Sequence, residues 1–402
     1  MASTRCHLNV SSGTHGLRMT TDQYACRLPV KIIRGGSSKG IFVRSEDLPQ
    51  AGPERDRLVL RLFGAPDVRQ IDGLGGGDKL TSKLAVMGTP TRSDCDISYL
   101  FAQVGTKFPD VDWDSNCGNI SSGAALFAAI DGVGTVEGGR QQIAIEQSNT
   151  GRRLLATVPF NGNRPAVTGT FAIGGVPGTG PRIDLDFADF EGSCLNRGLF
   201  PSGIRQQELA LPDDATFPVT IVDMANLNVL IQANVLGLDL SSSLEVMQNN
   251  TTLLDRLDAI RSAVLIELGL ATRESAPAII RRSVNPLIHI LAEPKSYRSL
   301  NGNHIDAGDC DLISRSYARR AFSKAFPGTG AIGVAVASRV TGTLATRYGS
   351  NAIDRRQIRI GHPSGCLGVE TIVSEVEKTV SIQRALIGRT ARVLMEGTAY
   401  LD

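Results

Sequence analysis

The chain has 402 residues, which suits one large or two medium domains and excludes a small module held together by disulfides. Lys and Arg together number 42 against 40 Asp and Glu, so no overall charge favours nucleic acid or an anionic membrane, and the expected partners are small molecules. No apolar run approaches the ~20 residues that cross a bilayer.

The seven cysteines are scattered and form neither a CxxC pair nor a Cys/His cluster with metal-ligand spacing. This pattern favours a reduced compartment, and we expect a cytoplasmic protein. Residues 1–27 are predicted to be a flexible N-terminal extension. Their Arg, Ser and Thr content also fits a weak mitochondrial presequence, which stays the alternative.

The N-terminal half is predicted to be mostly β. Strands at 31–34 and 41–43 flank a glycine-serine loop, a charged stretch at 45–63 is expected to be a helix, and strands follow at 83–87 and 97–102. The exception is the stretch from Ser115 to Ile130, whose end is apolar on nearly every side. That pattern predicts a helix enclosed by the sheet.

The C-terminal half follows a similar plan. Strands are predicted near 219–222, 229–231, 287–291 and 311–314, with a long amphipathic helix at 243–268. A tight Pro-Gly-Thr-Gly loop at 327–330 then opens a second apolar helix of small residues at 331–338. We therefore expect an α+β fold with two similar domains, 28–205 and 206–402, and a cleft between them.

Cys117 is the strongest single candidate for chemistry. It lies between Asn116 and Gly118 at the expected start of the buried helix, where unpaired N–H groups and the helix dipole favour a thiolate. A buried, inert cysteine is the alternative interpretation. Asn119 follows at once, and the sequon it begins is expected to be a chance match in a reduced compartment.

Lys83 is the second candidate, because it opens a strand that leaves a glycine loop, where partial desolvation would push its amine toward neutrality. A solvated lysine is the alternative, and that interpretation suits Lys79 better.

Three loops could bind a carboxylate. Ser37 and Ser38 lie in a loop of bare backbone that lacks phosphate-loop spacing, and the helix start at Gly328, Thr329 and Gly330 offers a second anion site. His362 and Ser364 belong to a tight loop in which the histidine could be a general acid, a carboxylate donor or a structural residue.

These motifs together resemble the PrpF family over residues 28–397, in the family's order. The segments that carry the resemblance are Arg34–Gly40, Gly75–Lys83, Asn116–Asn119, Gly328–Ala331 and Gly361–Gly365. The family includes 2-methylaconitate cis-trans isomerase, methylitaconate Δ-isomerase, aconitate isomerase and oxalomesaconate tautomerase. The resemblance implies the diaminopimelate epimerase-like fold, in which each of two domains wraps a sheet or barrel around a central helix.

The resemblance also implies a catalytic pair formed by Lys83 and Cys117, with substrate carboxylates held by Ser37 and Ser38. The resemblance fails at two positions. Where relatives typically carry Ser and His, this chain has Ala318 and Ser323. A two-thiol racemase is excluded, since the second-domain counterpart of Cys117 is Gly328 or Thr329.

The expected activity is a cofactor-independent isomerisation of an unsaturated polycarboxylate by proton transfer between Lys83 and Cys117. No motif implies a metal, flavin, pyridoxal phosphate or nicotinamide, and a homodimer is compatible with the sequence. Two alternatives stay open: an isomerase or cyclase acting on a less polar biosynthetic intermediate, and a non-catalytic carboxylate-binding protein. The predicted substrate-binding residues are Ser37, Ser38, Asn116, Gly118, Asn119, Gly328, Thr329, Gly330, His362 and Ser364.

Overall fold

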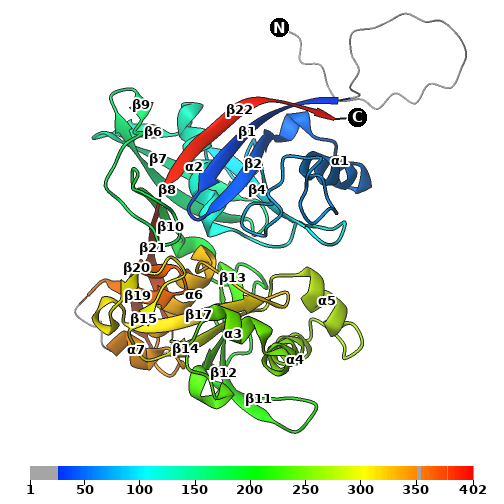
Figure 1. Cartoon of the computed structure of the whole chain (residues 1–402). Helices are drawn as coiled ribbons and strands as arrows, with labels where there is room; N and C mark the ends of the chain where they lie inside the picture. The colour runs from blue at the N-terminus through cyan, green and yellow to red at the C-terminus, as the bar shows by residue number, and fades with distance from the viewer. Residues whose placement is uncertain (1–25, 351–354, 378, 402) are drawn as a thin grey trace, which may run out of the picture.

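The computed structural model describes residues 26–350, 355–377 and 379–401. Nearly all of the predicted N-terminal extension lies outside the described residues. Two lobes are stacked in Figure 1, and β10 and β21 run between them. None of the helices in the described ranges combines the length and the apolar character needed to cross a bilayer.

The N-terminal lobe contains two helices and most of the early strands. They are β1 (Cys26–Gly35), β2 (Ser38–Arg44), α1 (Pro53–Phe63), β3 (Lys83–Gly88), β4 (Ile97–Val104), β5 (Val111–Asp112), α2 (Gly118–Ile130), β6 (Thr135–Glu137), β7 (Arg140–Gln147), β8 (Arg152–Asn161), β9 (Arg164–Pro165) and β10 (Ile183–Asp186). The expected helix at 45–63 is too long, because Pro53 takes the first helical position and only a 3₁₀ turn precedes it at Ser45–Asp47.

The C-terminal half of the chain carries the remaining described helices and ends in three long strands. Its elements are β11 (Gln207–Ala210), β12 (Thr216–Met224), β13 (Asn226–Gln232), α3 (Leu244–Asn249), α4 (Thr251–Glu267), α5 (Ala276–Arg282), β14 (Leu287–Ala292), β15 (Tyr297–Arg298), β16 (His304–Ile305), β17 (Leu312–Ala318), β18 (Ala321–Phe322), α6 (Gly328–Ser338), α7 (Thr346–Ser350), β19 (Gln357–His362), β20 (Gly365–Val376), β21 (Thr379–Arg389) and β22 (Ala391–Leu401). The helix expected at 243–268 is two helices, since Asn250 leaves helical geometry and accepts a bond from the Leu253 N–H at 3.0 Å.

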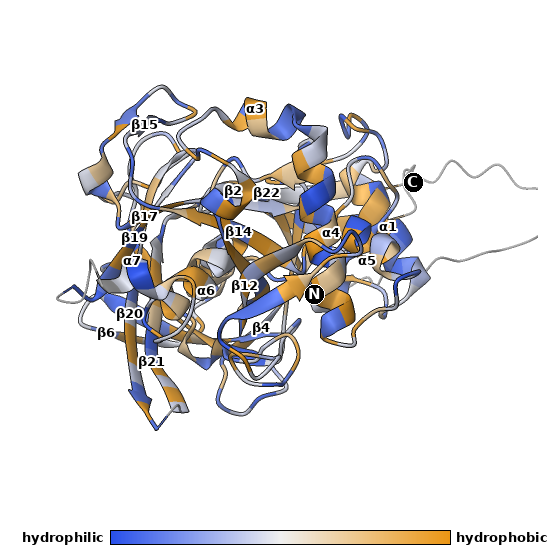
Figure 2. Cartoon of the chain, turned by 90° about the horizontal axis from the view of Figure 1, so that it is seen from below, coloured by the Kyte–Doolittle hydropathy of each residue, from blue (hydrophilic) through white to orange (hydrophobic). Residues whose placement is uncertain are grey.

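Each lobe encloses one central helix. α2 packs against β1, β2, β7 and β8, whereas α6 packs against β12, β13, β20 and β21. Figure 2 shows α6 surrounded by strands. One buried apolar cluster includes residues of both helices, such as Phe127 of α2 and Val336 of α6. The two lobes therefore share a core.

The last strand of the chain lies in the N-terminal lobe. β22 pairs antiparallel with β1 from Cys26↔Leu401 to Gly35↔Ala391, as Figure 1 shows by the red strand beside the blue one. The predicted domains 28–205 and 206–402 do not account for this return of the chain to the N-terminal lobe. Those two boundaries stay predictions.

Candidate active site

Cys117 occupies the N-cap of α2, as the sequence predicts. Its backbone is extended (φ −138°, ψ 98°), and no side chain caps the helix, so the first N–H groups of α2 have no intrahelical acceptor. The residue is buried, and its thiol makes no hydrogen bond within the described ranges. A sulfur atom therefore lies at the positive end of a buried helix.

The start of α6 meets the start of α2. A Cβ placed on Gly118 would lie 3.1 Å from the Thr329 nitrogen, and one placed on Gly328 would lie 3.6 Å from the Gly118 carbonyl carbon. Pro327 is the N-cap of α6 and offers no side-chain cap either. Two uncapped helix N-termini thus approach each other at the junction of the lobes, an arrangement that attracts an anion.

A turn from β12 to β13 lies against this junction. The Asn226 side-chain N–H donates to Thr329 Oγ1 at 2.6 Å, and the Asn116 side-chain N–H donates to the Ala225 carbonyl at 3.4 Å. The opposite amide oxygens of Asn116 and Asn226 are buried without a hydrogen-bond partner among the described residues. Unpartnered buried acceptors are rare in proteins and are typical of functional sites.

Lys83 is the first residue of β3 and is 6% exposed. Its Nζ donates to Gln103 Oε1 at 2.8 Å and lies 5.0 Å from the centroid of the Phe101 ring. The Gln103 amide N–H groups donate to the Ser82 carbonyl at 2.9 Å, which fixes the orientation of that amide. Lys83 is therefore a buried amine with one neutral acceptor, in agreement with the predicted desolvation.

Gly40 links Lys83 to the first turn of α2. It pairs with Lys83 across β2 and β3, and a Cβ placed on it would lie 3.1 Å from the Lys83 carbonyl and 3.0 Å from Ile120 Cδ1. Ile120 is the third residue of α2. The sheet that carries Lys83 and the helix that begins after Cys117 are thus in direct contact.

Lys79 differs from its predicted solvated state. It is half-buried, and burial, followed by the positive charges of Lys83 and Arg319, lowers its pKa to about 8. An amine of reduced basicity, that of Lys79, therefore lies near Lys83.

The glycine-serine loop also contacts α2. Ser37 Oγ accepts from the Asn119 side-chain N–H at 3.2 Å, and Asn119 Oδ1 accepts from Arg389 Nε at 2.9 Å. Ser38 is buried and its hydroxyl has no partner among the described residues. The loop thus presents one engaged and one unpartnered hydroxyl beside the start of α2.

A cavity of about 180 Å³ opens next to these contacts. Its walls include Ser37, Asn119, Phe326, His362 and Arg389; Lys83 and Cys117 are not part of its lining. The structure therefore brings three of the predicted substrate-binding residues, Ser37, Asn119 and His362, to one small space. The other seven do not line it.

His362 is a neutral, buried histidine. Burial, and then the charges of Arg389 and Arg315, lower its pKa to about 3. Its Nδ1 accepts from the Ser364 N–H at 3.3 Å, which leaves the proton on Nε2. Ser364 does not face the cavity, because its hydroxyl donates to the Lys324 carbonyl at 2.6 Å.

The two departures from the family pattern lie in a strand pair near α6. Ala318 ends β17 and is fully buried, whereas Ser323 is buried with a hydroxyl that has no partner in the described part of the chain. The nearby His289 contacts Ser316 Oγ at 2.8 Å and Asn228 Oδ1 at 3.0 Å. Burial lowers the pKa of His289 to about 3.

Sequence reasoning missed Gln103, Asn226, His289 and Arg389. Gln103 is found only from the register of β3 and β4, and Arg389 contacts Asn119 across 270 residues of sequence. No local motif marks any of the four residues.

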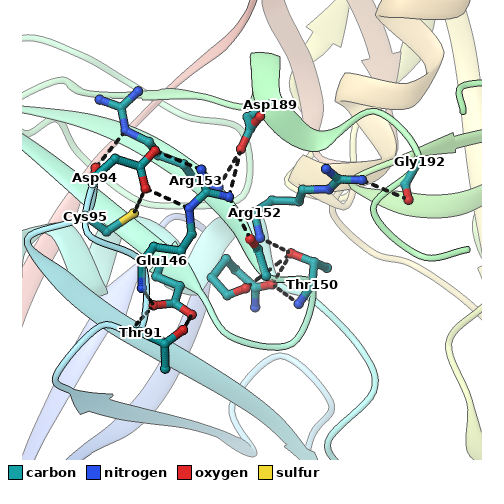
Figure 3. Close-up of polar contacts among 12 residues, drawn as sticks. Thr91, Asp94, Cys95, Glu146, Thr150, Arg152, Arg153, Asp189 and Gly192 are labelled. Carbon is teal, nitrogen blue, oxygen red and sulfur yellow. Dashed lines mark hydrogen bonds and ion pairs between the residues drawn. The ribbon is translucent and has the colours of Figure 1, made fainter. Parts of the chain in front are cut away.

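Two other features do not belong to this site. An apolar cavity of about 840 Å³ lies at the far end of α2, beside Ile130 and Val167. Figure 3 shows a polar cluster in the N-terminal lobe, where Glu146 accepts from Thr91 and the Arg152 side chain donates to the Gly192 carbonyl. These hydrogen bonds connect loops and strands of the lobe.

Comparison with known proteins identifies relatives over nearly the whole chain. Residues 25–402 match the model of the family described as PrpF protein. The chain is 36% identical over 377 residues to 3-methylitaconate isomerase of Eubacterium barkeri, covering 94% of this chain and 97% of that protein. It is 32% identical over 381 residues to 2-methyl-aconitate isomerase of Shewanella oneidensis, covering 91% and 94%.

Solved structures agree on the fold. The crystal structure of a methylitaconate-delta-isomerase superposes with a TM-score of 0.77 at 35% identity, covering 93% of this chain and 95% of that one. A hydroxyproline epimerase from Agrobacterium vitis superposes with a TM-score of 0.51 at 9% identity, covering 94% and 93%, and this likeness concerns the fold alone. The predicted diaminopimelate epimerase-like α+β fold is confirmed, and the chain belongs to the PrpF family of isomerases.

Proposed function

We propose that this protein is a cofactor-independent isomerase that moves a double bond, or interconverts the cis and trans forms, of an unsaturated polycarboxylate. The observation that carries the proposal is a pair of buried proton-transfer groups, Lys83 on β3 and Cys117 at the start of α2, on elements that contact each other. Relatives named methylitaconate and methylaconitate isomerases support the substrate class.

The proposed reaction begins with removal of a proton. The neutral amine of Lys83 takes a proton from the carbon α or γ to a carboxylate, which leaves a delocalised dienolate and an ammonium group. The Cys117 thiol then donates a proton to another carbon, or to the same carbon after rotation. A proton passing from the ammonium to the thiolate restores both groups.

The helix starts supply the stabilisation of the intermediate. Negative charge that develops on the substrate carboxylate meets the unpaired N–H groups at the starts of α2 and α6, which are already oriented. Gln103 holds Lys83 in place through an acceptor oxygen that carries no charge. A neutral acceptor leaves the amine form accessible, as a base requires.

Hydrogen exchange tests the proposal directly. The protein is incubated in D₂O with cis-aconitate, 2-methylaconitate or methylitaconate, and deuterium at vinylic and allylic carbons is followed by NMR. We expect exchange by the wild type, and a fall of about 10²- to 10⁴-fold in Lys83→Met and in Cys117→Ser.

Lys107→Met is the matched control, because Lys107 is exposed and lies outside the site. It should exchange at the wild-type rate. Wild-type exchange in Lys83→Met would overturn the role given to Lys83. Silence of the wild type with every acid would instead favour the less polar substrate or the non-catalytic carboxylate-binding protein.

A further inference from the structure

Arg389 is a buried cation with no carboxylate partner in the described part of the chain. It is 3% exposed, its Nε donates to Asn119 Oδ1, and its Nη1 donates to the Gly388 carbonyl, both at 2.9 Å. Its Nη2 makes no hydrogen bond to any described residue. Both acceptors are neutral, so the charge itself is uncompensated.

Burying an unpaired charge is costly, and folded proteins rarely retain one without a use for it. Burial lowers the pKa of Arg389 to about 10, so the guanidinium is charged at neutral pH. The missing partner is therefore an anion supplied from outside the chain.

The surroundings of Arg389 suit a carboxylate. The guanidinium lines the cavity of about 180 Å³ together with His362, whose Nε2 carries a proton, and Ser37. Asn119 holds the guanidinium through Nε, which leaves its outer nitrogen for a ligand. A guanidinium with a free outer nitrogen at the wall of a small cavity is suited to bind a carboxylate.

The cavity also lies at the right place for a substrate that reaches the helix starts. A Cβ placed on Gly328 would lie 3.2 Å from Arg389 Nη2 and 3.6 Å from the Gly118 carbonyl carbon. The guanidinium therefore lies beside the start of α6, which itself meets the start of α2.

We propose that Arg389, with His362, forms a second carboxylate subsite, which binds the carboxylate that is remote from the reacting carbons. The inference rests on the proposed function and specifies its substrate class. Substrates must carry at least two carboxylates, one at the helix starts and one at Arg389.

Binding of an unreactive acid tests the subsite without turnover. Tricarballylate and its monoamide, amidated at one terminal carboxylate, are titrated into the full-length protein by calorimetry. We expect Arg389→Met to bind tricarballylate about 10- to 100-fold more weakly than the wild type, the loss typical of a charge-assisted hydrogen bond. The preference of the wild type for the triacid over the monoamide should disappear in this variant.

Arg273→Met is the matched control. Arg273 is exposed and does not line the cavity, so its loss should change affinity less than twofold. Arg389→Lys keeps the charge without the fork and should bind with intermediate affinity, which separates recognition from a folding defect. Circular dichroism melts check that each variant is folded.

Two results would overturn the subsite: wild-type affinity for tricarballylate in folded Arg389→Met, or no binding of tricarballylate by the wild type. Failure of the proposed function has a different signature. In that case the wild type turns over none of the unsaturated acids, while the contrast between Arg389→Met and Arg273→Met in binding remains.

Discussion

At the scale of single residues, the site depends on the neutrality of the group that accepts from Lys83. Gln103 provides an amide oxygen at 2.8 Å where a carboxylate would fit equally well. A carboxylate at that distance would stabilise the ammonium form by a charge-assisted bond, whereas the proposed base must be an amine. An amide at this position therefore suits the proposed role of Lys83 as a base.

Gln103→Glu should consequently move the pH-rate profile. We expect the rising limb of kcat/KM to shift by about one pH unit toward alkaline values, with a lower rate at pH 7. The measurement is deuterium exchange from pH 6 to pH 10. Gln142→Glu, which adds the same charge at an exposed position of β7, should leave the profile in place. An unchanged profile in Gln103→Glu would contradict the role of Lys83 as base.

Local sequence motifs predict some residues of this site but not the others. Asn-Cys-Gly-Asn at a helix start and a lysine after a glycine loop point to chemistry because their backbone context is local. Gln103 and Arg389 act through a strand register and through a contact across 270 residues, which no local pattern contains. The roles assigned to Lys83, Cys117 and the binding residues are predictions that the proposed experiments test.

At the scale of elements, the close approach of α2 and α6 requires a residue without a side chain at position 118. A methyl group there would lie 3.1 Å from the Thr329 nitrogen and 3.3 Å from Thr329 Cγ2, both tighter than ordinary contacts. The two helix starts can therefore meet only because glycine is present.

Gly118→Ala should separate the two helix starts by a few tenths of an ångström. We expect a loss of about 1–2 kcal/mol in the free energy of unfolding, as for an overpacked core, and a fall in kcat of at least about tenfold. Urea unfolding and exchange kinetics measure the two effects. Gly308→Ala is the control, since no atom lies within 4 Å of its Cβ position. Unchanged kcat in Gly118→Ala would remove the helix starts from the mechanism.

The central helices are predictable because their apolar, small-residue composition fits only a position inside a sheet. Helix boundaries are less predictable from the sequence. The apolar periodicity at 243–268 continues across Asn250, while the backbone breaks there because an Asn side chain competes for the first N–H groups of the next helix.

At the scale of the whole molecule, two buried neutral histidines couple stability to pH. The pKa of His289 and that of His362 are lowered to about 3 by burial, from an ordinary value near 6.5. Between these values the unfolded chain binds protons that the folded chain does not, so stability falls as pH decreases through this window. Each histidine contributes a loss of about 2 kcal/mol between pH 7 and pH 5.

His289→Gln should therefore weaken the response to acid even if it lowers stability at pH 7. The difference in unfolding free energy between pH 7 and pH 5 should shrink by about 2 kcal/mol relative to the wild type. Urea denaturation at the two pH values, followed by circular dichroism, gives this difference. An undiminished difference would show that His289 is not the titrating group.

The two-lobed plan is visible in the sequence because each half repeats the order of sheet, glycine loop and buried helix. The sequence does not reveal the shared apolar core or the position of β22, since both depend on contacts between distant parts of the chain. The homodimer, the cytoplasmic location and the domain boundaries stay predictions.

The pairing of β22 with β1 has a consequence for biosynthesis. During translation β1 is made before the whole C-terminal lobe, whereas its partner β22 is made after it, so the N-terminal lobe completes its sheet only once the C-terminal lobe has been synthesised. A truncation that removed β22 would expose the edge of β1 to other chains, and we expect aggregation rather than a stable shortened protein.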